Sequence, residues 1–221
     1  MGRFAVGVVG CGSMGSALAE ALILGGQRVL LSGGRGRTAA ALAATLPGAH
    51  AVPPEVLARD SAIVFLATRL PVSRREVAPL LRGPLEGSVV VDLSNPEPAD
   101  LRDPAYDSAG ELVAELFPRS PVVKALNCVS ARRLRAVAHG APAPTVPIAG
   151  NDPAAKQCVS YLLERLGFDV ADAGPLHTSK WIEGLAALLR TLAEQEGLGD
   201  AVGFRLLRAD MTATDQTGVR R

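Results

Sequence analysis

A glycine-rich turn near the N-terminus constrains the fold of this chain more than any other feature. Gly10, Gly12 and Gly15 follow the apolar stretch 4–9 in a G-x-G-x-x-G spacing, and a helical pattern begins inside the turn. In such a unit the first glycine permits the tight turn, the second lets the backbone approach a pyrophosphate, and the third allows helix and strand to pack closely. The motif predicts a βαβ unit that binds a dinucleotide, the alternative being a strand-to-helix turn without a ligand.

The acidic residue that usually completes this motif is missing. A site for NAD carries an Asp or Glu about 20 residues after the glycines, where it accepts hydrogen bonds from ribose hydroxyls. Here no acid occurs between Glu20 and Glu55, and the expected region holds Ser32, Arg35 and Arg37. A hydroxyl and two guanidinium groups suit a 2′-phosphate, which a carboxylate would repel. The sequence therefore predicts a site for NADP(H), with NAD disfavoured, although each arginine taken alone could be a solvated surface charge.

The order of apolar segments predicts the fold class. Short β-branched segments alternate with helical patterns, and several segments are apolar on both faces, as in buried parallel strands. This pattern predicts an α/β fold with a Rossmann-type doubly wound, mainly parallel sheet and a C-terminal helical extension. The predicted strands are Phe4–Val9, Arg28–Leu31, Ala62–Ala67, Ser88–Leu93, Val122–Leu126, Thr145–Ala149 and Phe168–Ala171. The predicted helices are Ser13–Leu24, Thr38–Thr45, Pro54–Arg59, Ser73–Leu81, Ala109–Phe117, one within 151–167, and His177–Gly197.

The same pattern suggests how the chain is divided. Residues 1–174 are expected to form the NADP-binding Rossmann-like domain. Residues 175–210 are expected to form a helical segment that completes the cleft or makes a dimer contact, and 211–221, which are polar, a flexible tail. A long helix that follows a Rossmann sheet is a reasonable place for a two-fold contact between copies.

Composition excludes several classes of protein. Hydrophobic residues make up 48% of the chain and the net charge is +1, so no global field attracts nucleic acid or an anionic membrane. No stretch approaches the roughly 20 apolar residues that span a bilayer. The 3 cysteines are odd in number and form no C-x-x-C pair, which fits a reducing cytosol. We therefore expect a cytoplasmic protein with a small-molecule substrate, without nucleic-acid, membrane or metal partners.

Polar residues follow three later strands, at the edge of the sheet where a ligand of a doubly wound fold lies. They are Thr68 and Arg69, then Ser94, and then Asn127 and Ser130. One of them alone could be an ordinary loop residue, but three in register with the strand ends favour a nicotinamide site. His177 is the histidine nearest that cleft, and it is either a candidate to contact substrate or a surface residue at a helix start. Lys124 is interpreted as structural or phosphate-facing.

Longer strings carry a resemblance to a known family. They read "VVDLSN", "VVKALNCVSA" and "VPIAGNDPAAKQCVSYLLERLG", followed by "GPL" and "WIE". Together they resemble the NADPH-dependent deazaflavin (coenzyme F420) reductases, a family that includes the cytosolic oxidoreductase domain of the STEAP metalloreductases. The resemblance covers roughly residues 5–189, and its motifs are closer to the STEAP branch.

The resemblance implies hydride transfer between NADPH and FMN, FAD or a deazaflavin, in a protein that is commonly a homodimer. Carried over to this chain, it assigns the pyrophosphate to Gly10, Ser13 and Met14, the 2′-phosphate to Ser32 and Arg35, the cofactor lining to Ala67, Thr68 and Arg69, and the nicotinamide to Asn127 and Ser130. Arg132 stands where the STEAP branch has a tryptophan, so the acceptor side departs from that branch. Without a haem domain, ferric reductase activity is not expected to be inherited.

Two other functions remain open from the residues. NADPH could reduce a small C=O or C=N substrate directly, which would require a proton donor, and His177 and Lys180 are the candidates. Alternatively, the chain could be a redox sensor that binds NADP(H) without turnover, which an analogy of fold does not exclude.

Overall fold

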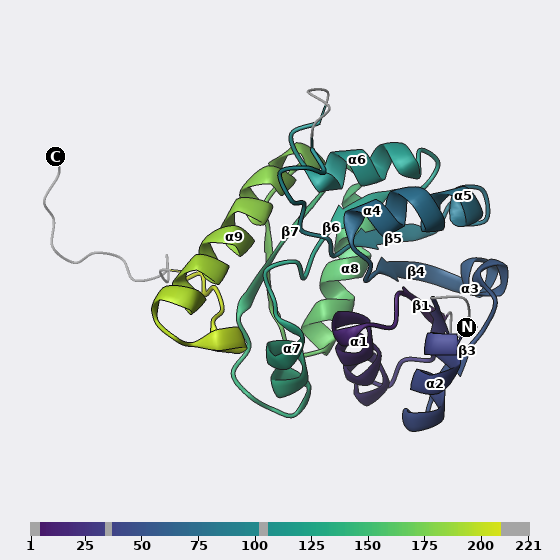
Figure 1. Ribbon diagram of the computed structural model, residues 1–221, viewed down its shortest axis with the longest axis horizontal. Coiled ribbons are helices and arrows are strands. Elements are labelled where there is room, and N and C mark those ends of the chain that lie inside the picture. The colour runs from purple at the N-terminus through teal and green to yellow at the C-terminus, as the bar shows by residue number, and fades with distance from the viewer. Residues whose placement is uncertain (1–4, 34–36, 102–105, 209–221) are drawn as a thin grey trace, which may run out of the picture.

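The computed structural model describes residues 5–33, 37–101 and 106–208 (Figure 1). These residues form one 8-stranded sheet in the order β3-β2-β1-β4-β5-β6-β7-β8, which confirms the predicted Rossmann-type α/β fold. The strands are β1 (Ala5–Val9), β2 (Val29–Ser32), β3 (Ala49–Ala51), β4 (Ser61–Leu66), β5 (Val89–Asp92), β6 (Val122–Lys124), β7 (Thr145–Gly150) and β8 (Asp169–Asp172).

The direction of the strands places the functional edge of the sheet. Strands β1 to β6 pair in parallel, so the segments that follow β1, β2, β4, β5 and β6 all leave the sheet at one edge. β7 then pairs antiparallel with β6, with Lys124 opposite Ala149, and β8 runs parallel to β7. Ligands of doubly wound sheets bind at the carboxyl edge, so this edge is the place to look for a site.

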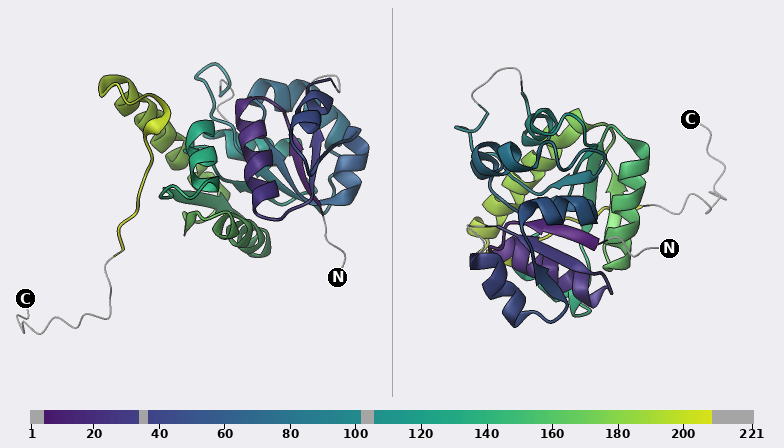
Figure 2. Two further views of the ribbon diagram at one scale, coloured as in Figure 1. Left: turned by 90° about the horizontal axis from the view of Figure 1, so that it is seen from below. Right: turned by 90° about the vertical axis from the view of Figure 1, so that its right-hand side faces the viewer.

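Helices cover both faces of the sheet (Figures 1 and 2). Alternate residues of each strand supply the two cores; Val8, for example, packs into one core and Val9 into the other. The first core is covered by α1 (Ser13–Leu24), α2 (Arg37–Thr45), α7 (Ala131–Ala138) and α8 (Pro153–Arg165). The second is covered by α3 (Pro54–Asp60), α4 (Leu70–Val72), α5 (Ala78–Leu81) and α6 (Ala109–Leu116).

The helix after β4 differs from its predicted form. It begins at Leu70, three residues before the predicted start at Ser73, and it contains a π-helical turn at Ser73–Val77 between α4 and α5. Leu70 and Pro71 open it, as proline in a first helical turn favours. A π turn inserts one extra residue into the helix and is common at functional sites. This turn carries Arg74, Arg75 and Glu76.

Two elements were not predicted. β3 lies at the edge of the sheet and contains only three residues, "AHA", which are too few to show an alternating or apolar strand pattern. α7 contains three arginines in "ARRLRAVA", and only Leu134 and Val137 are buried. Its apolar face is therefore too narrow to be found by periodicity.

The C-terminal part leaves the body of the sheet after β8. A 3-10 turn at Leu176–Thr178 leads into α9 (Ser179–Gln195), which projects beyond the sheet (Figure 2). A second 3-10 turn at Gly199–Ala201 is followed by the extended residues 202–208. These return to the sheet, where the Thr145 amide donates to the Phe204 carbonyl at 2.8 Å. None of the helices in the described ranges is long and apolar enough to span a bilayer.

A buried cluster of charges joins α9 to the sheet. The Lys124 side chain at the end of β6 has no exposed surface, and its ammonium group lies 2.8 Å from both Asp92 Oδ2 and Glu183 Oε1. Its remaining donor bonds to the Ser94 carbonyl oxygen. All three donors of the lysine are thus used, by β5, by the turn after it and by α9. Lys124 is structural, one of the two interpretations of the sequence.

Glu183 also binds the start of α6. Its carboxylate accepts from the backbone amides of Ala109 at 3.1 Å and Gly110 at 3.2 Å. The Ser108 hydroxyl accepts from the next backbone amide, that of Glu111, at 3.2 Å. The first turn of α6 therefore has its otherwise free donors satisfied, and a negative charge at its N-terminus is favourable.

The pKa values of this cluster have one common cause. Burial by itself lowers the pKa of Lys124, but the charges of Asp92 and Glu183 outweigh it and hold that pKa above its usual value. Burial raises the pKa of Glu183, and the Lys124 charge only partly opposes the rise. One ammonium and two carboxylates bury a net negative charge, which favours the proton-bound form of both groups.

We expect Lys124→Met to lower the free energy of unfolding by about 3–5 kcal/mol, because it leaves two buried carboxylates without a counter-charge. Burial, no longer opposed by the lysine charge, then holds the pKa of Glu183 in the folded variant above its value in the unfolded chain. Stability is therefore lost as the pH rises through that window and regained as it falls. Urea denaturation at about pH 8 and about pH 5 measures both effects.

The exposed pair Arg59–Asp60 supplies the control for this experiment. Arg59→Ala breaks a solvent-exposed ion pair, and we expect no measurable loss of stability. The role given to Lys124 would be wrong if Lys124→Met behaved like Arg59→Ala at both pH values.

Candidate functional site

The fold itself requires two glycines of the motif. Gly10 has a φ of +101°, and a Cβ added there would lie 2.7 Å from the Ala67 carbonyl oxygen and 2.8 Å from Thr68 Cγ2. A Cβ on Gly15 would overlap the carbonyl oxygen of Gly10. The first position therefore needs glycine for its backbone and for a close neighbour, and the third lets α1 approach the turn.

Gly12 is different, because nothing in the described protein explains it. Its φ of −77° is open to any residue, and no heavy atom lies within 4 Å of an added Cβ. Gly12 is exposed and forms the N-cap of α1, where no side chain caps the helix. The first backbone amides of α1, at Ser13 and Met14, thus begin beside open space. A helix N-terminus with this opening fits an anionic group such as a pyrophosphate.

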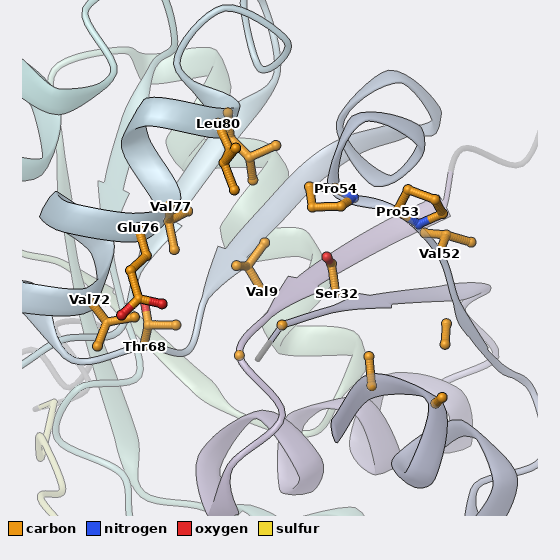
Figure 3. A pocket seen from close by; sticks show the side chains of 16 residues that line it. Val9, Ser32, Val52, Pro53, Pro54, Thr68, Val72, Glu76, Val77 and Leu80 are labelled. Carbon is orange, nitrogen blue, oxygen red and sulfur yellow. The ribbon is translucent and has the colours of Figure 1, made fainter. Parts of the chain in front are cut away.

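A cavity of about 540 Å³ opens on one side of the glycine turn (Figure 3). Ser32 at the end of β2 faces it and is 5% exposed, and its carbonyl accepts from the Gly10 amide at 2.8 Å. The walls are mostly apolar side chains of the segment after β3 and of the helix after β4. The residues that line it are Val9, Gly10, Ser32, Gly33, Ala39, Ala40, Ala51, Val52, Pro53, Pro54, Thr68, Val72, Glu76, Val77, Leu80 and Leu81.

The two arginines predicted beside Ser32 are not positioned here. Arg35 lies outside the described residues, and of Arg37 only the backbone is described, as the first residue of α2. The Thr38 hydroxyl donates to the Gly33 carbonyl at 3.1 Å and so fixes the start of α2 near the end of β2.

A second cavity, of about 230 Å³, opens between the turn after β6 and the C-terminal part. Asn95 and Asn127 hold each other beside it. The Asn95 amide donates to the Asn127 carbonyl at 2.8 Å, and the Asn127 amide donates to Asn95 Oδ1 at 2.9 Å. The lining residues are Asn95, Asn127, Cys128, Val129, Ser130, Ala186, Leu189, Arg190, Ala193, Gly199, Asp200 and Val202.

The backbone before Asn127 is strained. Leu126 has a φ of +60°, and it is the non-glycine residue with a positive φ in the described ranges. This conformation is costly for a residue with a Cβ and persists where its surroundings impose it. Here the strain directs Asn127 toward Asn95 and α9, since its amide also donates to the Ile182 carbonyl at 3.3 Å. Strain of this kind gathers at functional sites.

Ser94 carries a polar atom that the described protein leaves unsatisfied. The residue is 4% exposed, and its Oγ has no hydrogen-bond partner. Its amide donates to Asp92 Oδ1 at 2.9 Å, and its carbonyl accepts from Lys124, so the backbone of this turn is fixed. A buried hydroxyl without a partner is costly, and a bound ligand would remove that cost.

The other predicted residues divide between the cleft and the surface. Ala67 and Thr68 meet Gly10, and the Thr68 hydroxyl lies 2.6 Å from the hydroxyl of Ser73. Arg69 is exposed and precedes the helix after β4. Ser130 caps α7 and donates to the Asp200 carbonyl at 2.9 Å, so it anchors the C-terminal part beside the second cavity.

The two predicted proton donors lie away from these cavities. His177 is exposed on the 3-10 turn before α9 and lines neither cavity. The Lys180 ammonium group pairs with Asp107 at 2.9 Å. Burial raises the pKa of Cys128 to about 12, so the thiol in the second cavity stays protonated near neutral pH. In the described ranges no group of three or more His, Cys, Asp or Glu could hold a metal ion.

Several residues of the site were missed from the sequence. Asp92 ends the buried strand "VVVD" beside Lys124, which the sequence already singles out at the end of "VVK", and two opposite charges at the ends of neighbouring buried strands are a signal for a pair. Glu183, Arg190 and Glu76 gave no such signal, because each lies on a helix whose partners are distant in the chain.

Comparisons with known proteins indicate an NADP-dependent oxidoreductase. Residues 5–96 match the family described as NADP oxidoreductase, coenzyme F420-dependent. The chain is 31% identical to metalloreductase STEAP3 of Rattus norvegicus over 182 residues and 32% identical to metalloreductase STEAP2 of Mus musculus over 195. These matches cover 81% and 85% of this chain but only 36% and 37% of those relatives, so the chain spans little more than a third of their length.

A solved structure extends the match over the whole fold. A protein of Arthrobacter sp. FB24, assigned as an F420-dependent NADP reductase, superposes with a TM-score of 0.80 at 28% identity. The alignment covers 93% of this chain and 100% of that one. The resemblance predicted from the sequence is confirmed. Residues 5–96 thus match the coenzyme F420-dependent NADP oxidoreductases, and the solved structure extends the similarity over the whole Rossmann-type fold.

Proposed function

We propose that this protein transfers hydride between NADP(H) and a flavin or deazaflavin acceptor. The observation that carries the proposal is the open space at Gly12, which lies at the N-terminus of α1. The fold does not need glycine at this position, whereas a pyrophosphate at the helix N-terminus does. The family match over residues 5–96 includes this turn and supports NADP as the dinucleotide.

Each part of NADP(H) has a place in this arrangement. The pyrophosphate lies on the amides of Ser13 and Met14, and the adenosine enters the first cavity. Ser32 faces that cavity from the end of β2, and Arg35 and Arg37 follow it in the sequence. A 2′-phosphate near Ser32 would meet a hydroxyl and the two arginines, and no acidic residue lies nearby in the sequence.

The nicotinamide lies toward the second cavity. The unpartnered Ser94 hydroxyl and the fixed side chain of Asn127 are the groups that would hold it. α9 and the C-terminal part form the other wall of this cavity, where the acceptor ring would lie. The nicotinamide itself supplies the hydride, so the protein needs to bind, orient and shield the two rings and needs no strong acid or base.

We expect Arg35→Ala to weaken NADPH binding by about tenfold or more, because it removes a charge-assisted hydrogen bond to the 2′-phosphate. NADH lacks that phosphate, so its weaker binding should not change. Titration of both nucleotides by calorimetry measures this. Arg59→Ala, an exposed arginine on α3, is the control and should bind like the wild type. Equal affinity of the wild type for NADPH and NADH would refute the role given to this loop.

We expect the protein to oxidise NADPH in the presence of FMN, FAD or coenzyme F420, and Asn127→Ala to reduce kcat by about tenfold or more through loss of orientation. Absorbance at the NADPH band measures the rate, and Thr45→Ala on α2 is the control. Turnover with small carbonyl or imine substrates and none with flavins would support direct reduction instead. Tight binding without turnover on any acceptor would support a sensor.

We also propose that the protein is a homodimer that pairs through α9. Trp181, Leu185, Leu188 and Leu192 lie at helical spacing on this helix. Trp181 is 71% exposed and Leu188 54% exposed, which is unusual for large apolar side chains in a row. A two-fold contact would cover this stripe, because α9 of one copy would pack against α9 of the other copy.

We expect Leu188→Glu to convert the dimer to a monomer, since it places a charge in the apolar contact. Light scattering coupled to size exclusion measures the mass. Tyr161→Ser is the matched control, because Tyr161 is 62% exposed but lies on α8. A monomeric wild type, or a Leu188→Glu variant that remains a dimer, would show that α9 is not the contact.

A further inference from the structure

Glu76 is the charged residue among those that line the first cavity, and no part of the reaction accounts for it. It lies in the π-helical turn, between Val72 and Leu80, and all three residues line the same cavity. Figure 3 shows its carboxylate on the cavity side of the helix, near Thr68. The extra residue of the π turn helps to set which side chains of this helix face the cavity.

The surroundings of Glu76 call for a hydrogen-bond donor. A carboxylate can only accept hydrogen bonds, and among the described residues Glu76 has neither an ion-pair partner nor a side-chain hydrogen bond. The facing wall, Val52–Pro54, is apolar and has no donor side chain. The hydroxyls of Thr68 and Ser73 lie 2.6 Å apart, so one of these two hydroxyls donates to the other. Glu76 is exposed, so water solvates its carboxylate in the free protein, and a ligand that displaces this water has to supply a donor in its place.

We propose that Glu76 accepts a hydrogen bond from the exocyclic amino group of the purine in the first cavity, and so selects adenine. The proposal rests on the proposed binding of NADP(H) and names a residue that determines specificity at that site. The apolar walls fit a flat ring, and the carboxylate reads the edge of that ring. Adenine presents an amino donor at this position, whereas hypoxanthine and guanine present a carbonyl acceptor.

A ring with a carbonyl at this position meets the carboxylate with like partial charges. At the 6-position neither the carbonyl nor the carboxylate can donate to the other, so this contact is lost, and the N1–H donor of hypoxanthine could replace it only after a shift of the ring. A site built to accept from an N–H group rejects an analogue without it far better than an apolar pocket rejects a change of size. The negative charge of Glu76 also repels the 2′-phosphate, which favours binding of that phosphate on the opposite side of the cavity, near Ser32.

The test compares NADPH with reduced nicotinamide hypoxanthine dinucleotide phosphate, which differs only in the base. Calorimetric titration gives both dissociation constants for the wild type, Glu76→Gln and Arg75→Gln. We expect the wild type to prefer NADPH by about tenfold. Glu76→Gln should reduce that ratio to within about twofold, because an amide can donate or accept. Arg75, an exposed neighbour in the same π turn that does not line the cavity, should keep the wild-type ratio when replaced.

The outcomes separate this inference from the proposed function. Tight binding of NADPH with the same ratio in the wild type and in Glu76→Gln would overturn the role of Glu76 and leave NADP(H) binding intact. No binding of NADPH to the wild type would overturn the proposed function, and the base selection with it. Glu76 is exposed, so Glu76→Gln is expected to fold, and a thermal unfolding curve matched to the wild type checks this.

Discussion

The buried contact of Lys124 with Asp92 and Glu183 holds together the part of the molecule on which the site depends. It joins β5, β6, α6 and α9, four elements that are far apart in the sequence. The same lysine fixes the turn at Ser94, and that turn presents Asn95 to Asn127. A lysine in this position is stable only because carboxylates surround it, since an unpaired buried charge costs several kcal/mol. The position of α9, which forms one wall of the second cavity, thus depends on the balance of charge between Lys124 and the two carboxylates.

The two ends of the cleft are built on different physical grounds. At the glycine turn the backbone makes the proposed site, through two glycines that the fold requires and a third, Gly12, that has open space around it. At the first cavity, mostly apolar walls leave Glu76, Ser32 and Thr68 as the polar side chains in the lining. At the second cavity, the site is formed by the side-chain amides of Asn95 and Asn127 and by the strained backbone at Leu126. The sheet places these parts along one edge, so an extended dinucleotide can reach all of them.

The family match covers the part of the chain to which we assign the cofactor. The family match covers residues 5–96, which contain the glycine turn, the first cavity and the turn at Ser94. The second cavity is formed almost entirely by later residues, including Arg190 and Asp200. The family match thus leaves out most of the proposed acceptor site, so a common cofactor is compatible with different acceptors among relatives.

The sequence by itself determined the fold class, seven of the eight strands and the glycine turn, because these depend on local patterns of apolar residues and on the glycines at positions 10 and 15, which the turn requires. It also predicted the polar residues at the strand ends, since parallel strands bring their carboxyl ends to one edge. The tertiary structure alone decided that Lys124 is a buried counter-ion and that Glu183 on α9 pairs with it. It also decided that Glu76 faces the first cavity. Those contacts join residues distant in the chain, and a π turn or a strained leucine leaves no periodic signal. The short edge strand β3 and the arginine-rich helix α7 were not predicted for a related reason, because each has a weak apolar pattern of its own and is stabilised mainly by packing against neighbouring elements.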